Sequence, residues 1–129
     1  MAGDLELFKT SREDFKLFKN VYMLWADKFG LTDWEISFYW EDSSEPGAAC
    51  GGISRNAPGR NACVYFGKVW NMPVTKNDIE RTAIHEFSHL LVADMEHLAN
   101  SRYVTESEID LCRESLARRF ENAFYPKKH

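Results

Sequence analysis

Hydrophobic residues at the start of the chain recur at helical spacing. Between residues 11 and 29, aromatic side chains follow one another every three or four positions, which is the spacing of one face of an α-helix. Ser11 and Asp14 are typical of an N-terminal cap, and Gly30 stands where a helix commonly ends. The pattern therefore predicts a first helix that packs on a sheet of the same protein.

From Trp34 onward the period of the pattern changes to two. Apolar residues alternate with more polar ones over residues 34–40, which is typical of a half-buried strand. Two further strands are predicted over residues 48–54 and 61–68, on either side of a turn at residues 56–59. The Gly51-Gly52 pair indicates a bulge or a close backbone approach.

The rest of the chain predicts two helices. The first covers residues 77–97, with Thr75/Asp78 and Asn77/Glu80 as alternative capping pairs, and the second covers residues 106–124 behind a Thr105-x-x-Glu108 capping box. The order α-β-β-β-α-α predicts an α+β domain with a three-stranded, mainly antiparallel sheet. At 129 residues the chain has room for a single domain, residues 1–129.

Composition and charge exclude several classes of protein. The net charge of −4 gives no electrostatic footprint for nucleic acid or for an anionic membrane. No apolar run approaches the roughly 20 residues of a membrane span, and the N-terminus lacks the apolar region of a signal peptide. Cys50, Cys63 and Cys112 show no Cys-x-x-Cys spacing, so we expect reduced thiols and a cytoplasmic protein.

One motif carries candidate chemistry. The segment His85-Glu86-Phe87-Ser88-His89 lies inside the predicted helix 77–97, so its two histidines stand one turn apart on one face. Two imidazoles in this arrangement can share one Zn²⁺ ion. Glu86 is rotated by roughly 100° from His85 and is placed as a general base toward zinc-bound water. On a helical wheel, both histidines lie outside the apolar arc, as metal ligands require and core histidines do not.

A catalytic zinc site needs a third protein ligand and one open position. Glu108, near the start of the last helix, is the favoured candidate, although the capping box competes for the same carboxylate. Glu106 is a second candidate, and His97 would bind only if the chain turned back toward the motif. The sequence leaves these alternatives open.

The motif resembles the gluzincin pattern of zinc metallopeptidases, of which thermolysin is the familiar example. The Glu106-Ser107-Glu108-Ile109-Asp110 stretch is similar to the Glu-x-Glu-Ala-Asn stretch of ImmA/IrrE-type peptidases, with Ile109 and Asp110 in place of Ala and Asn. In that family the second Glu binds the metal, which here implies Glu108. The segment Arg118-Arg119-Phe120-Glu121-Asn122 also resembles the closing helix of small metallopeptidase-like proteins of tailed phages.

The resemblance implies a minimal zincin-like domain that hydrolyses peptide bonds. Zinc is the implied cofactor, and His85, His89 and Glu108 are the implied ligands. A peptide or protein substrate would add as a strand to residues 48–54 or 61–68, and Tyr65 or Tyr103 would serve as oxyanion donor unless each only packs. The short chain favours a narrow set of targets. The alternative is a non-catalytic binding module that zinc stabilises, and the sequence leaves the oligomeric state open.

Overall fold

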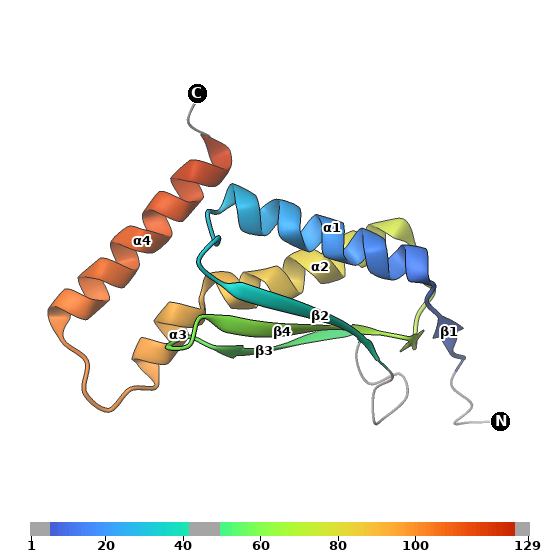
Figure 1. The fold of residues 1–129 in the computed structure, drawn as a ribbon, viewed down its shortest axis with the longest axis horizontal. Coiled ribbons are helices and arrows are strands. Elements are labelled where there is room, and N and C mark those ends of the chain that lie inside the picture. Colours follow the sequence, from blue (N-terminus) through green and yellow to red (C-terminus); the bar gives the residue numbers. More distant parts are fainter. Residues whose placement is uncertain (1–5, 42–49, 126–129) are drawn as a thin grey trace.

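The computed structural model describes residues 6–41 and 50–125. A three-stranded sheet carries helices α1 and α2 on one face, α3 follows α2 directly, and α4 lies across one end of the molecule (Figure 1). In chain order the elements are β1 (Phe8–Lys9), α1 (Arg12–Lys28), β2 (Glu35–Glu41), β3 (Gly51–Asn56), β4 (Asn61–Gly67), β5 (Val69–Trp70), α2 (Lys76–Leu91), α3 (Ala93–Ala99) and α4 (Glu106–Phe124). The α+β class predicted from the sequence is confirmed.

The three-stranded sheet is mixed, so the expectation of a mainly antiparallel sheet is wrong. Its strand order is β2-β4-β3. The hairpin of β3 and β4 is antiparallel, whereas β2 runs parallel to β4, with Glu35 opposite Asn61. The next described strand, β3, lies at the outer edge, and its hairpin with β4 inserts β4 between β2 and β3. A second, two-stranded sheet of β1 and β5, which the sequence did not predict, pairs Phe8 with Trp70.

The core lies between this sheet and the two long helices. Alternate residues of β4, namely Ala62, Val64 and Phe66, are buried on the helix side, as a period of two requires. Aromatic rings fill the space, and those of Phe18 and Phe66 have centroids 4.8 Å apart. Burial of large rings of this kind is the main source of stability in a domain of this size.

The helix predicted over residues 77–97 is divided at Val92 into α2 and α3. The Val92 backbone departs from helical geometry (φ −97°, ψ 8°) without a proline or glycine nearby. Two ion pairs hold α3 against the end of the sheet: Arg55 binds Glu96 and Arg60 binds Asp94, both on α3. The helical period of residues 77–97 therefore did not reveal the break at Val92.

The predicted helix boundaries are otherwise accurate. Ser11 caps α1 through a capping box with Asp14, and Gly30 follows the helix at a positive φ of 73°, which glycine adopts without strain. Thr75 rather than Asn77 caps α2. The helix α4 has the predicted bounds and the predicted capping box.

The remaining structural expectations concern cysteines and membranes. Cys50, Cys63 and Cys112 are all free thiols, as expected from their spacing. Across residues 6–41 and 50–125, no helix is both long enough and apolar enough to cross a membrane.

Candidate functional site

The packing of α2 fixes the direction in which the motif faces. Ile79, Ala83, Phe87 and Leu90 are buried along one side of this helix, and Phe87 contacts the rings of α1 and its C-terminus. This apolar stripe locks the rotation of the helix about its axis. The histidines of the motif therefore lie outside this buried stripe, on the part of α2 that solvent can reach.

The two imidazoles lie next to each other, as the spacing predicts. The ring centroids of His85 and His89 are 5.0 Å apart and the ring planes meet at 84°. His85 is exposed and His89 is half-buried. This donor set fits two of the ligand positions of a zinc ion.

Glu86 differs from its neighbours because it is buried. Its side chain points back toward the sheet, and the residue is only 8 % exposed. Removal from water raises the pKa of this carboxyl above its ordinary value, against the opposing charges of His85, His89 and Arg55. A carboxyl with a raised pKa accepts and returns a proton more readily near neutral pH.

The start of strand β3 is crowded by Thr82 of α2 and by the Tyr65 carbonyl of β4, and this crowding explains Gly51. A Cβ atom at position 51 would lie 3.1 Å from Thr82 Cγ2, 3.1 Å from the Tyr65 carbonyl oxygen and 3.6 Å from Glu86 Cγ. A Cβ atom at Gly52 would meet nothing within 4 Å. The first glycine of the pair is thus the close backbone approach, and it lies beside the candidate base.

A cavity of about 620 Å³ opens beside the motif. It lies between the start of β3, the segment after β5 and the N-terminal half of α2. Its lining residues are Cys50, Gly51, Met72, Asp78, Arg81, Thr82, Ile84, His85 and Glu86. The cavity therefore combines one candidate ligand and the candidate base with an apolar wall.

The sheet topology decides between the two candidate docking strands. In the part of the chain that the structure describes, β3 pairs only with β4, whereas β4 pairs on both sides. The segment 61–68 is therefore not an edge, and its choice as the strand that receives a substrate is wrong. β3 remains, and it is the strand that borders the cavity; residues 48 and 49 of the predicted segment lie outside the described residues.

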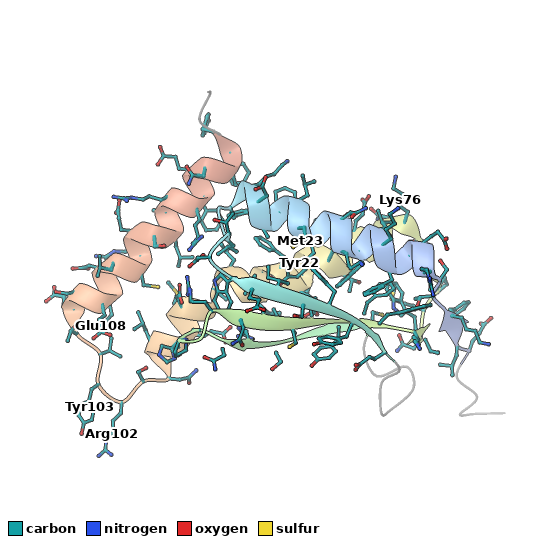
Figure 2. All side chains as sticks on the ribbon, viewed as in Figure 1. Tyr22, Met23, Lys76, Arg102, Tyr103 and Glu108 are labelled. Carbon is teal, nitrogen blue, oxygen red and sulfur yellow. The ribbon has the colours of Figure 1, made fainter. Side chains whose placement is uncertain are left out.

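The predicted third ligands do not join the histidines. Glu108 Oε1 accepts hydrogen bonds from the Thr105 backbone N–H at 3.2 Å and from the Thr105 hydroxyl at 2.9 Å. Figure 2 shows Glu108 at the start of α4, near the loop that carries Arg102 and Tyr103. Glu106 is exposed in the same turn, and His97 is exposed on α3. Among the described residues, no three His, Cys, Asp or Glu side chains are grouped as a metal site.

The two tyrosines considered as oxyanion donors are not among the residues that line the cavity. Tyr103 is 82 % exposed in the loop before α4. Tyr65 stacks on Tyr39 with centroids 5.5 Å apart. Both positions therefore match the packing or surface alternative rather than the catalytic one.

Sequence reasoning missed Arg55. This residue lies on β3, two alternations after Gly51, and therefore on the same side of the strand. Its charge acts on the Glu86 carboxyl and its guanidinium binds Glu96. The period-two pattern of β3 carried this signal, because it places positions 51, 53 and 55 toward α2.

Comparison with known proteins adds no relative. No family model, no curated protein and no solved structure matches this chain. The resemblance to gluzincins therefore rests on the sequence motif alone.

Proposed function

We propose that this protein is a zinc-dependent metallopeptidase on a minimal zincin-like domain, with a narrow set of peptide or protein targets. The observation that supports it best is the position of Glu86. This buried carboxyl lies between two neighbouring imidazoles and the edge strand β3, on the wall of one open cavity. General-base chemistry on an extended peptide needs these three parts together.

His85 and His89 would hold the zinc ion. Zinc, when bound, supplies Lewis-acid polarisation of a carbonyl oxygen and a water of lowered pKa. Glu108 stays the predicted third ligand, and its carboxylate would first have to leave Thr105. The adjacent imidazoles on α2 support this proposal, whereas Glu108 on α4 would bind only after a rearrangement.

The chain's own residues account for the other parts of the reaction. Within residues 6–41 and 50–125, the outer edge of β3 is unpaired and would offer its backbone groups to an extended substrate, and Gly51 lets that strand lie beside Glu86. Glu86 takes a proton from the attacking water and passes it to the leaving amine. Its burial favours this cycle because the protonated carboxyl is easier to form than in water.

The test combines metal analysis with cleavage of a proteome-derived peptide library, read by mass spectrometry. We expect Glu86→Gln to keep zinc and to lose cleavage by about 10²–10⁴-fold, and His85→Ala to lose zinc. Glu80→Gln, on the same helix, is the matched control and should change neither. A Glu86→Gln protein as active as the wild type would contradict the mechanism.

The same experiment separates the alternative reading. A holo protein that cleaves nothing, and whose melting temperature falls strongly when zinc is chelated, would be the zinc-stabilised binding module instead.

A further inference from the structure

Helix α2 carries three polar side chains in a row on the side that its buried stripe leaves open. Arg81, His85 and His89 are spaced by four residues, so they follow one another along the helix, one turn apart. Arg81 and His85 are both exposed, and both line the cavity of about 620 Å³. A permanent positive charge therefore lies on the cavity wall, one turn before the two imidazoles.

The guanidinium of Arg81 has no anionic partner in the part of the chain that the structure describes. Its six ion pairs all involve other residues. Asp78 lies three residues earlier and also lines the cavity, but its carboxylate accepts a hydrogen bond of 2.7 Å from the Thr75 hydroxyl at the start of α2. Arg81 is therefore available to an anion that enters the cavity.

The other side chains of the cavity wall compete little for this charge. Met72 and Ile84 line the cavity and are 38 % and 43 % exposed, so they present apolar surface. Glu86, the second acid of the lining, is buried against the sheet side of α2. A guanidinium binds a carboxylate through two parallel hydrogen bonds, and apolar walls strengthen the attraction. The cavity thus favours a carboxylate at Arg81.

The position of Arg81 along α2 determines where on a substrate this carboxylate would stand. One helical turn, about 5.4 Å, separates Arg81 from His85. An extended peptide beside β3 advances about 3.3 Å per residue. A carboxylate at Arg81 therefore belongs to a residue one or two positions away from the carbonyl group at the imidazoles.

We propose that Arg81 is a specificity-determining residue, which selects peptides with a carboxylate one or two residues from the bond that is cut. This inference rests on the proposed peptidase function. An acidic side chain and the C-terminal carboxylate of a peptide present the same chemical group, so both kinds of substrate fit. Such a requirement also accounts for a narrow set of targets.

The first test is cleavage by the zinc-loaded protein of peptides that differ only near the cut. One series carries Asp or Asn at each of the two positions on either side and has an amidated C-terminus, and a second series without acids ends in a free or an amidated C-terminus. We expect the carboxylate to raise kcat/KM at least about tenfold, mainly through a lower KM, because Arg81 binds the substrate before and during the reaction alike. The series in which this effect appears identifies the source of the carboxylate.

A charge reversal assigns the effect to one side chain. Arg81→Glu should abolish the preference for the carboxylate and favour Lys at the same position. Lys76→Glu is the matched control, because it makes the same change on the same helix outside the cavity lining. Figure 2 shows Lys76 at the start of α2, pointing away from the sheet. Equal preferences in the wild type and in Arg81→Glu would overturn the proposal and leave the peptidase function standing.

Binding to the zinc-free protein separates this inference from the proposed function. Fluorescence anisotropy of the same peptides, labelled at the N-terminus, requires neither metal nor cleavage. We expect the carboxylate peptides to bind at least about tenfold more tightly than their amide counterparts, and Arg81→Gln to remove the difference. If the wild type cuts no peptide, the peptidase function fails, and equal binding of the two kinds of peptide would then overturn the role of Arg81 as well.

Discussion

The helices α2 and α4 have similar length and similar caps, yet they are held very differently. Each begins at a threonine that accepts a hydrogen bond from the backbone N–H three residues on. Each also carries predicted metal donors. However, α2 buries six residues and α4 buries none. Burial therefore fixes the orientation of the motif on α2, whereas a few contacts with α1 and α3 set the orientation of α4.

The largest expected effect tests this difference in burial directly. Leu90→Ala on α2 removes a side chain that is 1 % exposed and should lower the free energy of unfolding by about 2–5 kcal/mol. Leu116→Ala, at a half-buried position of α4, should lower the free energy of unfolding by about 1 kcal/mol. Urea unfolding followed by circular dichroism measures both. Equal losses would mean that α4 is as firmly packed as α2.

A second pair of variants tests how closely strand β3 packs on α2. Gly51→Val introduces a side chain where even a Cβ atom would approach Thr82 Cγ2 and the Tyr65 carbonyl oxygen to 3.1 Å. This variant should lower the free energy of unfolding by about 1–3 kcal/mol because the added side chain overpacks the site. Gly52→Val is the control, since nothing lies within 4 Å of the corresponding position. The difference between their urea midpoints measures how closely β3 packs on α2, and identical midpoints would contradict the close approach.

The smallest expected effect concerns the caps. Thr75→Ala should lower the global free energy of unfolding by about 1 kcal/mol, because α2 unfolds only with the core. Thr105→Ala should leave global unfolding within about 0.5 kcal/mol and speed hydrogen exchange only in the first turn of α4. Native-state hydrogen exchange resolves the two cases. Loss of protection throughout the protein in Thr105→Ala would show that α4 unfolds together with the core.

The sequence predicted best what short-range patterns encode. Capping boxes, the 3.6-residue period and the motif spacing located three helices and placed His85 and His89 side by side. The pairing of β2 with β4 was not predictable in the same way, because alternation reveals which face of a strand is buried but not its neighbour or direction. The ion pairs that hold α3 against the sheet span 34 and 41 residues, which is beyond the reach of a local pattern.

At the candidate site, too, short-range patterns do not show which side chains meet in the fold. Glu108 occupies a sequence position that suits both a helix cap and a metal ligand, and local pattern alone does not choose between them. The structure engages its carboxylate with Thr105. Arg55 was missed for the related reason that its relevance to Glu86 arises only when β3 lies along α2.

The mixed sheet has a consequence for the order in which the chain assembles. The β3–β4 hairpin closes across Ala57–Arg60, whereas the pairing of Glu35 with Asn61 must close a loop of more than twenty residues. Loop closure costs more entropy as the loop lengthens. The hairpin is therefore the less costly pairing to form, while the pairing of β2, whose described residues pair only with β4, carries the larger loss of chain entropy. The edge strand beside Glu86 thus belongs to the half of the sheet that local pairing holds together.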